Sequence, residues 1–99
     1  MKKKYLTPGY LSAFYLELSV LLHAGIPVAD GLHLIAEDGD PEASLIIQLA
    51  DTVEQGIPLS EALEKTGVFP AYAVYLSSAG ERTGRQEESF RALSAYYDT

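Results

Sequence analysis

Two histidines, His23 and His33, are the residues best suited by type to acid–base or metal chemistry. They stand ten residues apart across a Gly-Pro break, whereas two metal ligands on one helical face are usually three or four residues apart. Ser77-Ser78 has no histidine close to it in sequence, and the chain contains neither a Gly-x-Ser-x-Gly turn nor a glycine-rich phosphate loop. The sequence therefore predicts two structural histidines, no cofactor and no enzymatic activity.

Three acidic residues, Asp38, Asp40 and Glu42, alternate in a segment that resembles the start of a calcium loop. Gly39 and Pro41 break the required spacing, however, and the distant bidentate glutamate is missing. We interpret these acids as helix-capping residues, with Asp40 as the N-cap and Pro41 as the first residue of the helix that follows.

Residues 80–84 contain two glycines and are predicted to form a turn. Thr83 and Gln86 have the spacing of a capping box for a final helix. Compared with Asp38, Asp40 and Glu42, Glu81 is a better candidate to bind a shared cation or to form a salt bridge at an interface. The alternative, which we favour, is a turn carboxylate that accepts backbone N–H bonds.

Seven tyrosines are many for a chain of 99 residues. A buried phenol needs a hydrogen-bond partner, and tyrosine is enriched at protein interfaces. We therefore expect one or two of Tyr10, Tyr75 and Tyr96 to contact a partner protein. Simple half-burial of these side chains is the alternative.

The charge balance excludes a nucleic-acid-binding function, because acids outnumber bases by 14 to 7 and the net charge is −7. Lys2-Lys3-Lys4 forms the one basic cluster, which we interpret as a solvated tail. The absence of cysteine excludes disulfides and thiolate metal sites. No apolar run approaches the roughly 20 residues needed to span a bilayer, so a membrane contact requires a longer chain.

Glycine and proline divide the chain into six short segments whose apolar residues recur every three or four positions. Thr7 is suited to cap the first helix, Pro8 to begin it and Gly25 to end it. The fifth segment, after Pro70, is apolar around much of its circumference, which predicts that it is the most central helix. The predicted fold is all-α, a compact six-helix bundle built from helix–turn–helix hairpins.

The sequence also contains a short internal repeat, in which residues 25–32 (GIPVADGL) match residues 56–63 (GIPLSEAL). In each copy a glycine ends one helix and a proline begins the next, so each copy encodes a helix–corner–helix hairpin. Two copies are too few for a solenoid, which needs about three repeats.

Four groups of residues, in a specific order and spacing, carry a resemblance to a known family. The groups are Phe14, Leu18, Leu22, Ala24, Gly25 and Pro27; Gly56, Leu59, Ser60 and Leu63; Phe69 and Pro70; and Gly80, Glu81, Thr83 and Gly84. Over about residues 12–97 the chain resembles the cytoplasmic domain of type II secretion system F proteins. That family includes the inner-membrane platform proteins of type IV pilus, archaellum-like and competence machines.

The resemblance implies an N-terminal arm over residues 1–9 and a cytoplasmic domain over residues 10–99, with a transmembrane helix expected after Thr99. This chain would then be a soluble fragment of a protein at the cytoplasmic face of the inner membrane. The implied function is a non-catalytic scaffold that links an assembly ATPase to the pseudopilin machinery.

The partners implied by the resemblance are the assembly ATPase, other inner-membrane assembly proteins, pilin-like subunits and often a second copy of the domain. The alternative function is a free-standing helical adaptor or regulator with no membrane partner.

Overall fold

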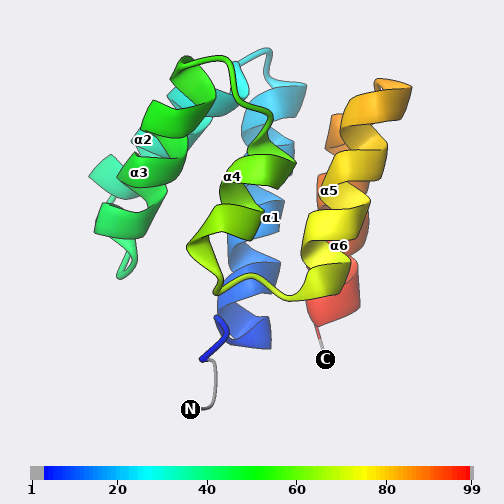
Figure 1. Cartoon of the computed structure of the whole chain (residues 1–99), viewed down its shortest axis with the longest axis horizontal. Helices are drawn as coiled ribbons and strands as arrows, with labels where there is room; N and C mark the ends of the chain where they lie inside the picture. The colour runs from blue at the N-terminus through cyan, green and yellow to red at the C-terminus, as the bar shows by residue number, and fades with distance from the viewer. Residues whose placement is uncertain (1–3, 99) are drawn as a thin grey trace.

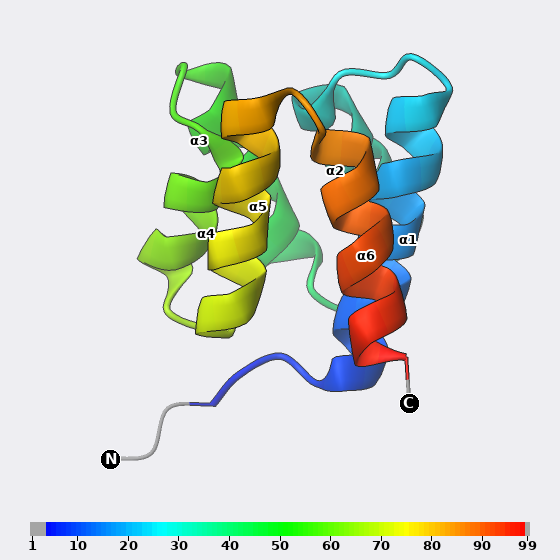
Figure 2. The same cartoon turned by 90° about the vertical axis from the view of Figure 1, so that its right-hand side faces the viewer.

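The computed structural model describes residues 4–98, so Lys2, Lys3 and Thr99 lie outside the described range. Within that range the chain forms helices and no strand, which confirms the predicted all-α bundle. The six helices are α1 (Pro8–His23), α2 (Val28–Glu37), α3 (Ala43–Glu54), α4 (Leu59–Thr66), α5 (Ala71–Thr83) and α6 (Gln86–Tyr97) (Figure 1). Each helix packs against its neighbours in sequence and α6 packs against α1, so the six helices form a closed ring (Figure 2).

The first helix begins and ends as its sequence predicts. The Thr7 hydroxyl accepts a hydrogen bond from the Tyr10 N–H at 3.1 Å, which satisfies one of the free N–H groups of the first turn. Gly25 has a φ of 88°, the left-handed conformation that glycine adopts at low cost. The Ile26 N–H then donates to the Leu21 carbonyl at 3.0 Å, the long bond of a Schellman motif.

The two repeated sequence segments also have similar backbone conformations. Gly56 has a φ of 94°, close to that of Gly25. Pro27 precedes α2 with φ −59° and ψ 151°, and Pro58 precedes α4 with φ −58° and ψ 145°. The same three-residue corner, Gly-Ile-Pro, therefore joins α1 to α2 and α3 to α4.

The core is centred on α1, whose Leu11, Phe14, Tyr15 and Leu18 are at most 2% exposed. The Phe14 ring meets the Tyr15 ring edge-on at 5.2 Å, an arrangement favoured by aromatic quadrupoles. Tyr15 also lies 5.8 Å from the ring of Phe90 on α6. The contact between Tyr15 and Phe90 joins the first helix to the last.

The prediction that the fifth segment is the most central helix is wrong. The buried residues of α5 are Ala73, Ser77 and Gly80, all of them small, whereas Tyr72 and Tyr75 are exposed. Apolar residues around most of a helix, as in α5, are compatible with a buried helix and also with a helix that turns its large side chains toward solvent. The small buried face of α5 instead allows its neighbours to approach closely.

The turn predicted at residues 80–84 is shorter than expected, because α5 continues through Gly80 to Thr83 and only Gly84 adopts the left-handed conformation, with φ 71°. The predicted capping box does not form. The Thr83 hydroxyl donates to the Ala79 carbonyl at 2.9 Å inside α5, while Gln86 is the first residue of α6.

The third helix begins at Ala43, two residues later than predicted from Pro41. Asp40 does not cap the helix itself. Its Oδ1 accepts the Glu42 N–H at 2.8 Å and its carbonyl accepts the Ala43 N–H at 3.1 Å, so Asp40 closes a turn that precedes α3.

Candidate interaction surface

Two motif residues from different helices, Ser60 on α4 and Glu81 on α5, meet in the structure. The Glu81 Oε2 accepts the Ser60 N–H at 2.8 Å, and its Oε1 accepts the Ser60 hydroxyl at 2.6 Å. Pro58, the N-cap of α4, has no side-chain acceptor. Glu81 therefore supplies from α5 the acceptor that the N-cap of α4 lacks, and its carboxylate adds a second negative charge to that of Glu61 in the first turn of α4.

Glu81 thus accepts a backbone N–H bond, as favoured from the sequence, but from another helix and not from its own turn. Both of its oxygens take part in this tether between α4 and α5. A cation at Glu81 remains a prediction.

The adjacent motif residue, Gly80, lies at a close contact between α5 and α6. A Cβ atom at this position would lie 2.8 Å from the Ser89 Cβ and 3.1 Å from the Arg85 carbonyl oxygen. The Arg85 N–H donates to the Gly80 carbonyl at 2.9 Å and closes the end of α5. Gly80 is therefore required by packing.

The remaining motif residues are spread through the fold and build it. The members buried in the interior are Phe14, Leu18, Leu59, Leu63 and Phe69, and Leu22 packs partly buried against them. The members at corners and helix ends are Ala24, Gly25, Pro27, Gly56, Pro70, Thr83 and Gly84.

The outward face of α5 carries large aromatic side chains. Tyr72 is 43% exposed and Tyr75 is 62% exposed. The Tyr72 ring lies 4.6 Å from that of Tyr96 on α6, which is 58% exposed. The Tyr96 ring also meets the buried Tyr97 edge-on at 4.9 Å, which attaches the exposed rings to the core.

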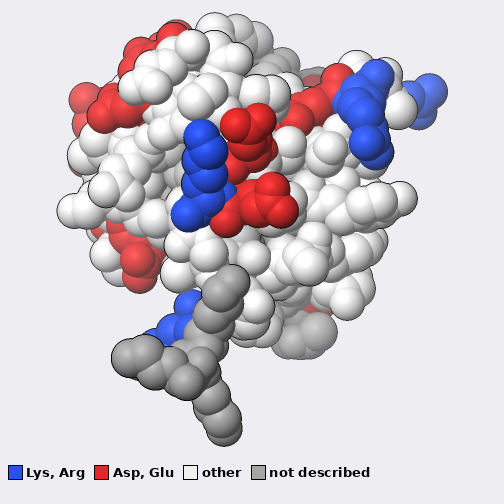
Figure 3. Space-filling view, in the orientation of Figure 1, with Lys and Arg blue, Asp and Glu red and all other residues white. Residues whose placement is uncertain are grey.

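We call Tyr5, Tyr72, Tyr75 and Tyr96 the tyrosine surface. Tyr5 is 52% exposed and lines a shallow hollow together with Tyr75, with Phe69 also in its wall. Helix α1 begins at the same end of the bundle where α5 begins and α6 finishes (Figure 2). No charged residue occurs between residues 71 and 80 of α5, and the lower half of that helix appears as an uncharged stretch in Figure 3.

Tyr75 and Tyr96, two of the three tyrosines predicted to contact a partner, lie in this surface, and Tyr10 does not. The Tyr10 hydroxyl donates to the Asp40 Oδ1 at 2.8 Å, and its ring stacks on Phe14 at 6.0 Å. Burial, together with the bond to Asp40, raises the pKa of Tyr10 well above its ordinary value. Tyr10 therefore ties α1 to the turn before α3.

The sequence did not single out Tyr5 or Tyr72. Tyr72 stands three residues before Tyr75 on the same helix, so both lie on one face of α5, and this spacing was the available signal.

The residues considered for catalysis, His23, His33 and Ser77, lie on three different helices. Ser77 is fully buried, so a substrate could not reach its hydroxyl. The His23 Nδ1 lies 3.0 Å from the Glu87 Oε2 of α6, and the His33 Nε2 lies 3.2 Å from the Glu54 Oε1 of α3. Each histidine thus pairs with a carboxylate on a different helix.

Among residues 4–98, none of the helices has the length and apolar character needed to cross a membrane. On the face shown in Figure 3, basic and acidic side chains are interspersed over α4 and the far end of α5. Lys65 pairs with Glu61 at 3.6 Å on α4. The tyrosine surface therefore lies beside a mixed-charge surface on a protein with net charge −7.

Comparison with known proteins gives matches along almost the whole chain. Residues 14–99 match the model of the family described as type II secretion system (T2SS), protein F. A type II secretion system protein F from Xanthomonas campestris is 30% identical over 99% of this chain and 25% of its own length. The type IV pilus assembly protein TapC from Aeromonas hydrophila is 32% identical over 81% of this chain and 20% of its own length.

A third relative, the protein transport protein HofC homolog of Escherichia coli, is 37% identical over 73% of this chain and 19% of its own length. The chain thus spans a quarter or less of the length of these relatives. The match to the family model covers nearly all of the bundle, including both Gly-Ile-Pro corners and the Ser60–Glu81 tether. The chain belongs to the type II secretion system protein F family.

Proposed function

We propose that this chain is the cytoplasmic scaffold domain of an inner-membrane platform protein in a type II secretion or type IV pilus-like machine. Its relatives are named for secretion and pilus assembly, and they are at least four times as long as the matched segment. In this proposal the domain holds partner proteins in a fixed geometry and does not itself catalyse a reaction.

The observation that carries the proposal is the orientation of α5. A helix that buries Ala73, Ser77 and Gly80 while exposing Tyr72 and Tyr75 turns its two aromatic side chains toward the surface. Tyrosine is enriched among the residues that dominate binding energy at interfaces. It also offers a large rigid contact area at a low cost in conformational entropy.

The proposed partner of the tyrosine surface is the assembly ATPase, and other inner-membrane assembly proteins and pilin-like subunits would contact the rest of the platform protein. The net charge of −7 favours a partner with a basic face, because charge complementarity speeds encounter and selects the partner. The tyrosines would then supply most of the affinity.

The test uses the full-length platform protein, extracted in detergent, and its cognate assembly ATPase in a co-purification assay. The double variant Tyr75→Ser/Tyr96→Ser should retain about tenfold less ATPase than the wild type, since both side chains are solvent-exposed anchors. Circular dichroism of the isolated domain should stay unchanged, because neither tyrosine belongs to the core.

The matched control is Leu34→Ser/Ile47→Ser, which removes two apolar side chains of 44% and 43% exposure from α2 and α3. This control should retain the ATPase within about twofold of the wild type, because such exposed substitutions outside an interface have small effects. Wild-type retention by the tyrosine variant, or an equal loss in both variants, would contradict the proposal.

A further inference from the structure

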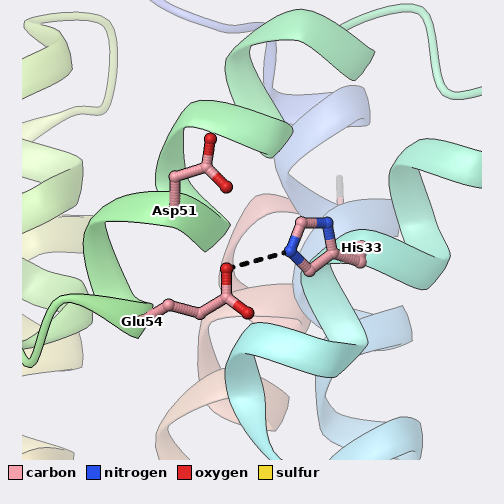
Figure 4. Close-up of side chains that lie close together, drawn as sticks. All are labelled: His33, Asp51 and Glu54. Carbon is pink, nitrogen blue, oxygen red and sulfur yellow. Dashed lines mark hydrogen bonds and ion pairs between the residues drawn. The ribbon is translucent and has the colours of Figure 1, made fainter.

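Three metal-ligating side chains meet on the face formed by α2 and α3 (Figure 4). His33 comes from α2, and Asp51 and Glu54 come from α3, three residues apart on one helical face. One nitrogen or oxygen atom of each side chain lies within 4.8 Å of the others. Figure 4 shows all three side chains pointing toward the space between the two helices.

The distances suit a small tetrahedral ion. Zn²⁺ binds nitrogen and oxygen ligands at about 2.0–2.1 Å, so two ligands of a tetrahedral site are about 3.3 Å apart. The His33 Nε2 and the Glu54 Oε1 are already 3.2 Å apart. Asp51 would need to approach by about 1.5 Å at most to complete three protein ligands. Rotation of its exposed side chain can supply that movement.

The backbone under this group is held by the core and not by the ligands themselves. Leu32 and Ile35 of α2, and Ile46 and Leu49 of α3, are at most 2% exposed. Because this packing fixes the two helices relative to each other, an ion would find its ligands largely pre-positioned. The His33 side chain is 36% exposed and that of Glu54 51% exposed, so water can reach the fourth coordination position.

The other histidine provides an internal comparison. His23 also pairs with a glutamate, at 3.0 Å from the Glu87 Oε2. That same oxygen, however, accepts a bond from the Arg91 guanidinium at 2.6 Å. A guanidinium repels a second cation, and among residues 4–98 His33, Asp51 and Glu54 form the one group of three ligands that meet in this way.

We propose that His33, Asp51 and Glu54 form a Zn²⁺ site that joins α2 to α3. One imidazole and two carboxylates match the ligand preferences of Zn²⁺, whereas Ca²⁺ and Mg²⁺ take shells of oxygen alone. The bound ion would also relieve the repulsion between the Asp51 and Glu54 carboxylates in a chain of net charge −7. Spacing along the sequence could not indicate this site, because its ligands come from two helices.

The test is isothermal titration of the untagged chain with Zn²⁺ alone. The wild type should bind one Zn²⁺ per chain. His33→Gln and Asp51→Asn should each lower the affinity by about tenfold or more, since even residues that only support zinc ligands typically contribute that much. The matched control His23→Gln, which leaves the same number of histidines as His33→Gln, should change the affinity by less than about twofold.

Circular dichroism of each variant establishes that the helices are retained, and Asp51→Asn keeps the test decisive if His33→Gln unfolds. Equal loss of Zn²⁺ binding in the two histidine variants would overturn the proposal, as would a wild-type chain that binds no Zn²⁺. Titration with Ca²⁺ provides a further check. Ca²⁺ binding as tight as that of Zn²⁺, and unaffected by His33→Gln, would also overturn it.

Discussion

The two Gly-Ile-Pro corners share one backbone conformation but differ in what holds the helix that follows. At the second corner the Glu81 carboxylate reaches from α5 to the first turn of α4 and binds Ser60. At the first corner the position equivalent to Ser60 is Ala29, which has no side chain for such a bond. The start of α2 is held by packing, with Gly31 buried against Leu21.

The difference shows that the repeated residues determine the backbone of the corner, whereas a residue outside the repeat, Glu81, determines how the helix after the second corner is held. Both corners reverse the chain, but the tether at the second corner also fixes α4 against α5. Because α5 also carries Tyr72 and Tyr75, the tether connects the second of the two repeated corners to the helix that presents the tyrosine surface. Changes at the two corners should therefore have unequal effects.

The largest expected effect is at Glu81. Glu81→Ala should lower the free energy of unfolding by about 2–3 kcal/mol, because it removes two hydrogen bonds to a carboxylate and leaves the nearly buried Ser60 N–H and hydroxyl without that acceptor. For a chain of this size the melting temperature should fall by about 10–20 °C. Thermal unfolding followed by circular dichroism measures the change.

Glu64→Ala is the matched control, because Glu64 is an exposed glutamate on α4 itself. Its expected effect on the free energy of unfolding is within about 0.5 kcal/mol. Similar melting temperatures for the two alanine variants would show that the tether contributes little and that packing alone positions α4.

A smaller change in the free energy of unfolding is expected when Ser60, at the α4 end of the tether, and Ala29, its equivalent at the first corner, are exchanged for one another's residue type. Ser60→Ala should cost about 1 kcal/mol, since the hydroxyl bond is lost while the bond from the backbone N–H to Glu81 remains. The reverse exchange, Ala29→Ser, should change the free energy of unfolding by less than about 0.5 kcal/mol, because no carboxylate is bonded at the first corner.

Urea unfolding of both variants tests this asymmetry directly, because both substitutions exchange the same two residue types at equivalent positions. Equal destabilisation by Ser60→Ala and Ala29→Ser would mean that the two corners are energetically equivalent.

Much of the fold could be predicted from the sequence, because its signals are local. Thr7 and Gly25 mark the ends of α1 through backbone conformation and capping, which depend on neighbouring residues alone. The predictions at Gly80 and for the centrality of α5 were wrong because both depend on tertiary contacts. Gly80 lies inside α5 and packs closely against Ser89 of α6, and no spacing within α5 reveals that contact.

The candidate sites were likewise predictable only where they depend on local signals and not on tertiary contacts. Tyr75 and Tyr96 could be selected by residue type, but the partner of each ring and the bond from Tyr10 to Asp40 depend on packing between distant segments. The group around His33 combines residues 18 and 21 positions apart, on two helices that only the packed hairpin brings together. Residue type thus identified candidates, and the fold determined which of them meet.

The smallest expected effect has the opposite sign. Gly31→Ala gives the first corner the residue found at the equivalent position of the second, Ala62. The added Cβ would lie 3.5 Å from the Leu21 Cδ1 and 3.8 Å from the Leu18 Cδ2, which are ordinary contacts. The substitution should therefore raise the free energy of unfolding by about 0.5–1 kcal/mol through the better helix propensity of alanine.

Gly25→Ala is the matched control for this change, since it is the same substitution at a position with φ 88°. It should destabilise the chain by about 1–2 kcal/mol, because an L-residue is strained in the left-handed conformation. Urea unfolding of the two variants should thus give shifts of opposite sign. A loss of stability in Gly31→Ala would mean that the packing of α2 against Leu18 and Leu21 of α1 does not accept a methyl group, and that this packing holds the first corner as firmly as the tether holds the second.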